Sequence, residues 1–113
     1  MTTTSLSATW LAAQHGVDPV RIERRRRAGE LFATRENGGR EWRYPMWQFD
    51  TDGQVRPAVA RLLQLAKENR IPHDRLEQLL DRKVGLVGGK TVLELLVNGG
   101  ADEALEEVRG AAQ

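Results

Sequence analysis

The stretch "VDPVRIERRRRAG", residues 17–29, decides how the first half of the chain folds. Asp18 is a favoured N-cap residue, and Pro19 suits the first helical position because its missing N–H would have no helical partner there. Gly29 adopts the left-handed conformation that ends many helices at little cost. The stretch therefore predicts a helix that begins after Asp18 and ends before Gly29.

A shorter helix is predicted just upstream, in "ATWLAAQHG", residues 8–16. Ser7 can cap its start, and Gly16 is a natural end. Two short helices joined by a tight turn form a helix-turn-helix pattern. Residues 1–6 are expected to be disordered. The apolar side of the upstream helix is expected to consist of Trp10, Leu11 and Ala13 or Gln14.

A β-hairpin is predicted after the second helix. "ELFATRE", residues 30–36, reads as a strand with Leu31 and Ala33 on one face and Phe32 on the other. The "NGG" that follows favours a hairpin turn, because Asn and Gly accept positive φ at little cost. "REWRYPMWQF" then predicts a second strand as far as Pro45. A hairpin placed directly after a helix-turn-helix is a wing.

The second half of the chain is predicted to be wholly helical. "DTDGQ" at residues 50–54 is rich in turn-forming residues and marks the expected module boundary. We therefore expect a winged helix-turn-helix module at 7–50 and a helical module at 55–113. The expected fold class is mainly α with a small β-hairpin wing. Four helices are predicted in "RPAVARLLQLAKENR", "IPHDRLEQLLDRK", "TVLELLVNGG" and "DEALEEVRGAA".

The arginines of residues 17–29 are predicted to form a basic surface. With Ile22 in the core, helical geometry turns Arg25 and Arg26 toward the buried side, where their stems can pack while the charged ends reach solvent. The outward-pointing residues are Val20, Arg24 and Arg27, flanked by Arg21 and Ala28. Exposed arginines on a second helix suit guanine edges and phosphates in a DNA major groove. The candidate DNA-binding residues, from this helix and the hairpin, are Arg21, Arg24, Arg25, Arg27, Arg35, Arg40 and Arg43.

The charge distribution supports this interpretation. The net charge of the chain is only +1, yet residues 18–43 hold eight arginines against five acids. A basic first half on a nearly neutral chain indicates one face for a polyanion. A simpler alternative is a solvated charged face, paired with Glu23 and Glu30. Trp42 and Trp47 could stack on bases, but at least one of them is expected to belong to the core.

Other classes of function find little support in the sequence. The chain has no cysteine, and its two histidines, His15 and His73, lie far apart, so neither a metal site nor a cofactor is expected. Asp74, next to His73, is interpreted as a helix cap, and no enzymatic activity is expected. No apolar run is long enough to span a bilayer, and the first residues lack a signal peptide pattern, so a cytoplasmic location is expected.

"GLVGGKT", residues 85–91, looks at first sight like a phosphate-binding loop. Such a loop needs four residues between its first glycine and Gly-Lys-Thr, and that position holds Val84. A strand should also precede the loop, whereas an acidic, helix-like segment does so here. Thr91 and Glu94 instead match the capping box that starts a helix. The glycines therefore predict the end of one helix and the start of the next.

Two parts of the chain resemble known families. Residues 11–50, with "AG" before "L-x-A-x-R" and an aromatic-Pro strand, resemble the winged helix-turn-helix of MerR-like and excisionase-like regulators. "GLVGGKTVLELLVNGGADEALEEV", residues 85–108, is similar to the toxin-binding domain of Xre/MbcA/ParS-type antitoxins. The chain departs from these patterns in having Arg26 at a usually apolar position and "DRKVGLV" in place of an aromatic-rich, proline-containing loop.

The resemblance implies an antitoxin that neutralises a RES-type toxin, which is an NAD-consuming enzyme, and represses its own operon by binding double-stranded DNA. It also implies a homodimer. The residues carried over for toxin binding are Lys90, Glu94, Glu106, Glu107 and Arg109. An alternative is a stand-alone winged-helix transcriptional regulator, or a phage-type architectural DNA-binding protein, whose C-terminal helices only dimerise.

Overall fold

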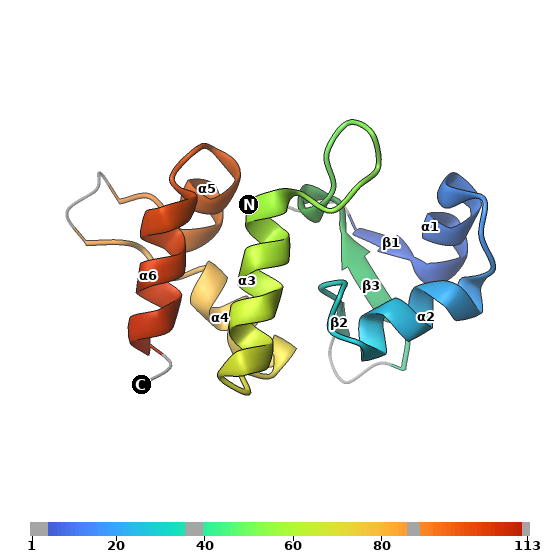
Figure 1. Cartoon of the computed structure of the whole chain (residues 1–113), viewed down its shortest axis with the longest axis horizontal. Coiled ribbons are helices and arrows are strands. Elements are labelled where there is room, and N and C mark those ends of the chain that lie inside the picture. Colours follow the sequence, from blue (N-terminus) through green and yellow to red (C-terminus); the bar gives the residue numbers. More distant parts are fainter. Residues whose placement is uncertain (1–4, 36–39, 86–88, 112–113) are drawn as a thin grey trace. The chain divides into compact units, whose positions relative to one another are not determined.

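The computed structural model describes residues 5–35, 40–85 and 89–111. The chain divides into two compact units, Met1–Arg56 and Pro57–Gln113 (Figure 1). The structure is mainly helical with one small antiparallel sheet, which confirms this much of the expected fold class. The division follows the "DTDGQ" segment, and the functional roles of the two modules stay predictions. None of the described helices is long and apolar enough to cross a membrane.

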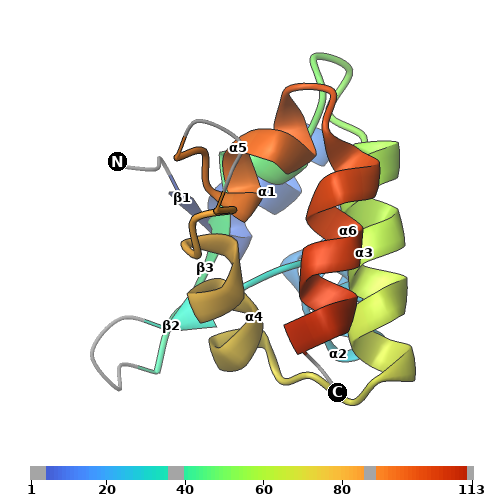
Figure 2. The ribbon, with the colours of Figure 1, turned by 90° about the vertical axis from the view of Figure 1, so that its left-hand side faces the viewer.

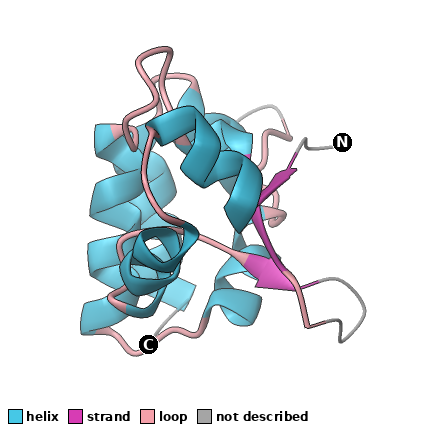
Figure 3. Cartoon of the chain, turned by 90° about the vertical axis from the view of Figure 1, so that its right-hand side faces the viewer, coloured by secondary structure: helices cyan, strands magenta, loops and turns pink. Residues whose placement is uncertain are grey.

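The first unit combines two helices with a small sheet (Figure 3). The strand order is β1-β3-β2, with both pairs antiparallel. Helix α1 contacts α2, β1 and β3. The core between them holds Leu11, Ile22 and Tyr44, each at most 1% exposed. The elements are β1 (Ser5–Ser7), α1 (Ala8–His15), α2 (Pro19–Arg27), β2 (Thr34–Arg35), β3 (Trp42–Pro45) and a 3₁₀ turn (Met46–Gln48).

Both helices of the first unit begin where their caps were predicted. The Ser7 hydroxyl accepts a hydrogen bond from the Trp10 backbone N–H at 3.3 Å. The Asp18 carboxylate accepts one from the Val20 N–H at 2.9 Å. Gly16 ends α1 in the left-handed conformation, with φ of 65°, which explains why glycine stands there. The predicted positions of these two helices are therefore confirmed.

The predicted apolar side of α1 was wrong in part. Leu11 and Ala12 are buried, whereas Ala13 and Gln14 are exposed and Trp10 is 64% exposed. The helix contacts the sheet as well as α2, so its buried side is set by tertiary neighbours that an isolated helical pattern does not include.

Strand β1 was not expected, because residues 1–6 were predicted to be disordered. Ser5 and Leu6 instead pair with β3, in the register Ser5↔Pro45 and Leu6↔Tyr44. Leu6 is half-buried against the core. A strand of three residues with one apolar side chain is too short for its sequence to show an alternating pattern.

The predicted strand at 30–36 is described as far as Arg35 and is mostly irregular chain there. Of these described residues, only Thr34 and Arg35 pair with β3, and the alternation of faces was wrong because Leu31, Phe32 and Ala33 are all buried. The return strand ends at Pro45 as predicted. The predicted turn at 37–39 lies outside the described residues.

The backbone of this buried segment is hydrogen-bonded by one side chain. Gln48 is fully buried, and its Oε1 accepts from the Phe32 N–H at 2.8 Å. Its Nε2 donates to the Phe32 carbonyl at 2.8 Å and to the Pro45 carbonyl at 2.9 Å. The amide thus gives Phe32 the donor and acceptor that a neighbouring strand would supply, which is why the segment can be buried without a ladder.

The described part of the second unit contains four helices, as predicted. Helix α6 packs on α3 and α5, and α5 also contacts α3 and α4 (Figure 2). Their apolar sides meet in a core that includes Val59, Leu62, Leu76, Val92 and Val108, none of them measurably exposed. The helices are α3 (Pro57–Glu68), α4 (His73–Leu80), α5 (Val92–Val97) and α6 (Ala101–Ala111).

The glycine-rich stretch connects α4 to α5, and the chain on either side of it pairs. The Val84 N–H donates to the Lys90 carbonyl, and the Val92 N–H donates to the Arg82 carbonyl, both at 2.9 Å. Thr91 caps α5 by accepting from the Glu94 N–H at 3.1 Å, and its hydroxyl donates to the Glu94 carboxylate at 3.3 Å. The helix start predicted from these residues is therefore confirmed.

The residues at the starts of two further helices, α4 and α6, have different roles from one another. Asp74 was expected to cap α4, but it lies inside the first turn and Pro72 occupies the cap position. Gly100 precedes α6 for a steric reason: a Cβ there would lie 2.9 Å from Cδ2 of Leu95. The close approach lets the Gly100 N–H donate to the Leu95 carbonyl at 2.7 Å.

Replacing Gln48 by alanine is expected to destabilise the first unit by about 2–4 kcal/mol, because it removes the hydrogen bonds that Gln48 makes to the buried backbone of Phe32 and to the Pro45 carbonyl. All three tryptophans lie in this unit, so tryptophan fluorescence during urea unfolding measures its stability. Gln14→Ala, at an exposed site on α1, is the matched control and should change the free energy of unfolding by less than about 0.5 kcal/mol. Equal effects of the two substitutions would contradict the role given to Gln48.

Candidate nucleic-acid interface

Helix α2 presents a basic face to solvent. Ile22 is 1% exposed and turns into the core as predicted, which directs Val20, Arg24 and Arg27 outward. Val20 is 54% exposed. We call the exposed residues Val20, Arg21, Arg24 and Arg27 the arginine face.

The arginine face borders a shallow hollow with an acidic rim. Asp18 and Glu30 line it together with residues of α2, and the Asp18 carboxylate is already used as the helix cap. Arg25 is two-thirds buried, and its Nε lies 3.8 Å from the Glu30 carboxylate. Within the described part of the chain, the three arginines of the arginine face have no acid within ion-pairing distance. Their charges are therefore available to an external anion.

The predicted hairpin arginines occupy different environments. Arg35 and Arg40 are exposed. Arg43 is half-buried in the central strand, where its guanidinium donates to the Ser5 carbonyl at 3.5 Å and lies 3.5 Å from the Glu41 carboxylate. Arg43 thus contributes contacts within the sheet, and Arg35 and Arg40 are the hairpin cations open to solvent.

Trp42 connects the helix to the hairpin. The guanidinium carbon of Arg26 lies 4.2 Å from the centroid of the Trp42 ring, and that of Arg35 lies 4.5 Å from it. Trp42 packs half-buried against the core, and Trp47 is half-buried with its ring 5.4 Å from that of Phe32. Neither tryptophan is fully buried. The sequence predicted a half-buried Arg26 but not its aromatic partner.

Burial also alters the chemistry of Tyr44 beneath this region. The side chain has no measurable exposure, and desolvation raises the pKa of its phenol above the ordinary value of 10.0. The nearby Arg26 guanidinium acts in the opposite direction, and the Glu23 carboxylate adds to the rise. The hydroxyl of Tyr44 and the Nε of Arg26 are both buried and close, without a well-formed hydrogen bond between them. Arg26 is therefore held from two sides, by Trp42 and by the core.

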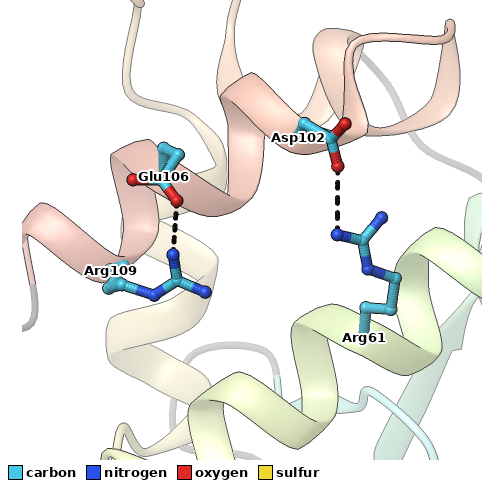
Figure 4. A network of polar contacts seen from close by, with 4 residues as sticks. All are labelled: Arg61, Asp102, Glu106 and Arg109. Carbon is cyan, nitrogen blue, oxygen red and sulfur yellow. Dashed lines mark hydrogen bonds and ion pairs between the residues drawn. The ribbon is translucent and has the colours of Figure 1, made fainter.

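In the second unit, most of the residues expected to bind a toxin already contact neighbouring residues (Figure 4). Glu106 and Arg109 form an ion pair along α6, and Asp102 of the same helix pairs with Arg61 of α3 at 3.0 Å. Glu107 pairs with Arg82 at 3.1 Å. Such exposed pairs contribute little to stability and exchange readily for other partners.

The remaining two residues of that set flank the start of α5. Glu94 is half-buried and belongs to the cap of the helix with Thr91. Lys90 is exposed, and its backbone carbonyl closes the glycine-rich connection. On α4, burial and the neighbouring carboxylates of Asp81 and Asp74 raise the pKa of Glu77, so this helix carries an acidic side. The described residues contain no group of three potential metal ligands.

Comparison with known proteins identifies a related fold. No family model and no curated protein matches the sequence. Among solved structures, the NMR structure of Rv2175c superposes with a TM-score of 0.82 at 20% sequence identity. The match covers 98% of this chain and 82% of the other. The similarity extends over both units of the chain and shows a shared fold.

The pKa of Tyr44 leads to a prediction for alkaline pH. The unfolded phenol ionises near pH 10.0, whereas the folded phenol stays protonated to a higher pH. The contribution of Tyr44 is therefore present below pH 10.0 and is lost as the pH rises through the folded pKa. We expect the first unit to lose stability in this range and Tyr44→Phe to reduce the loss.

The measurement is simplified because the chain contains one tyrosine, so tyrosinate absorbance during an alkaline titration reports on Tyr44 alone. The midpoint in the folded protein should exceed that in urea. Equal midpoints would show that the phenol is not buried in solution.

Proposed function

We propose that this chain is a DNA-binding antitoxin: its first unit binds double-stranded DNA as a winged helix-turn-helix, and its second unit binds and neutralises a RES-type toxin. DNA binding would also serve to repress the operon that encodes the pair. Helix α2 is the proposed recognition helix, and the hairpin of β2 and β3 is the proposed wing.

The observation that carries the DNA-binding part is the arginine face. Its three guanidinium groups project from one side of a capped helix that is fixed in place by Ile22, and no described acid neutralises them. Guanidinium groups pair with the O6 and N7 atoms of guanine or with phosphates. Val20, exposed in the first turn of the same face, suits an apolar contact with a thymine methyl group.

The toxin-binding part is supported by the second unit. The second unit carries the residues on which the resemblance to Xre/MbcA/ParS-type antitoxins depends, and the capped start of α5 places Lys90 just before the helix and Glu94 in its first turn. The ion pairs of Glu106, Glu107 and Arg109 leave their charged groups at the surface, where a partner of complementary charge could exchange for them. A dimer would place two copies of α2 against two half-sites of an operator.

Arg24→Ala and Arg27→Ala are each expected to weaken DNA binding and to lower its salt dependence. Each lost phosphate contact should reduce the slope of log K against log salt concentration by about 0.9. Fluorescence anisotropy with a labelled duplex, selected from random sequences by the wild-type protein, measures both quantities.

The control is Arg75→Ala, which changes the net charge equally but lies exposed on α4 of the second unit. Its slope should match the wild type. Unchanged slopes in both α2 variants would refute the placement of this helix on DNA. An equal change of the slope in Arg75→Ala would show that the effect comes from the net charge alone.

A tagged full-length chain, purified from its native host, is expected to retain a toxin-like enzyme in near-stoichiometric amount, identified by mass spectrometry. The captured enzyme should consume NAD, and addition of the chain should inhibit it. Lys90→Glu should reduce the retention by reversing an exposed charge at the proposed contact, whereas Arg75→Glu should not.

Recovery of only the chain itself and DNA would refute the antitoxin part. It would support the alternative, a transcriptional regulator or architectural protein whose second unit only dimerises. Inhibition that is equally lost in both charge-reversal variants would place the contact elsewhere on the second unit.

A further inference from the structure

A single indole ring joins three elements of the first unit. Trp42 belongs to β3, Arg26 to α2 and Arg35 to β2, and both guanidinium carbons lie within 4.5 Å of the Trp42 ring centroid. Arg35 and Trp42 are also direct partners across the two strands. Side chains that face each other in this way lie on the same side of a sheet, so the stacking follows from the register of the hairpin.

The two arginines differ in how they are held. Arg26 is half-buried with its Nε shielded from solvent beside Tyr44, so it is anchored in the unit. Arg35 is exposed, and its guanidinium carbon lies 4.5 Å from the centroid of the Trp42 ring. A flexible arginine at the surface would sample many rotamers, and ordering it on binding costs entropy. A ring that holds one face of the guanidinium leaves the N–H edges directed outward.

We propose that Trp42 is a positioning residue that orders Arg35 for contact with a DNA phosphate. The inference rests on the proposed DNA-binding function. Arg26 fixes the Trp42 ring relative to α2, so Arg35 of the proposed wing keeps a constant position relative to the arginine face. The pair of like charges on one ring also makes a bound phosphate favourable, since the anion reduces their mutual repulsion. Arg26 thereby gains a role that a plain hydrophobic contact would not provide.

A double-mutant cycle with Trp42→Leu, Arg35→Ala and the combined variant tests the coupling. Arg35→Ala alone should weaken binding of the selected duplex by about two- to fivefold, the upper range of one exposed contact between opposite charges, and lower the salt slope by about 0.9. In the Trp42→Leu background the same substitution should have a smaller effect. Trp42→Phe keeps an aromatic face and should retain most of the coupling. Thermal unfolding of each variant checks that the first unit remains folded.

An independent readout needs no DNA. The ¹⁵N heteronuclear NOE of the Arg35 Nε–H should be high in the wild type, low in Trp42→Leu and restored in Trp42→Phe. Arg40, exposed beside the hairpin, serves as the mobile reference in all of them. Should Trp42→Leu prove too unstable, the comparison of the wild type with Trp42→Phe and Arg26→Leu gives the same test.

The outcomes separate the inference from the function on which it rests. An ordered Arg35 with no DNA binding by the wild type would refute the proposed function, and with it the role of Arg35 on DNA. DNA binding in which Arg35→Ala has the same effect with and without Trp42 would refute the positioning role alone. A low NOE for Arg35 in the wild type would do so as well.

Discussion

The side-chain amide of Gln48 is the contact on which the first unit depends. It makes one hydrogen bond with the buried N–H of Phe32, one with the Phe32 carbonyl and a third with the Pro45 carbonyl, so it fastens the segment after α2 to the end of β3. Removing the amide would delete three buried hydrogen bonds at once. This segment connects α2 to the hairpin of β2 and β3. By holding the segment in place, the amide also fixes the arginines of α2 relative to those of the hairpin.

The helices could be predicted from the sequence because each is specified within its own segment. Ser7, Asp18 and Thr91 supply cap oxygens, and the hydrogen bonds that they accept are present in the structure. Ile22 alone was enough to orient α2, since the other side chains follow from helical geometry. The outward direction of Arg24 and Arg27 needed no knowledge of the rest of the fold. Prediction succeeded in most places where the determining interactions span about one helical turn; the expected Asp74 cap of α4 is the exception.

Prediction from the sequence failed where a structural feature depends on a contact with a residue that is distant in the chain. Strand β1 exists because β3 offers it a partner some 40 residues away, as the pair Ser5↔Pro45 illustrates. The burial of Phe32 depends on Gln48, 16 residues further along the chain, and a buried glutamine has no signature in a hydrophobic pattern. Trp42 was recognised as an aromatic residue near a basic surface, but its two arginine partners lie on elements whose proximity only the tertiary structure reveals.

The distribution of ion pairs gives the two units different electrostatic characters. In the second unit, Arg61, Arg82 and Arg109 each contact an acid, so these three charges are compensated at its surface. In the first unit, the arginine face stands without such compensation among the described residues, and like charges gathered on one helix repel one another. A helix C-terminus tolerates cations through its dipole, which helps to explain how four arginines can end α2. The repulsion that remains would be relieved by a bound polyanion, so the proposed binding of DNA predicts that its ligand also stabilises the first unit.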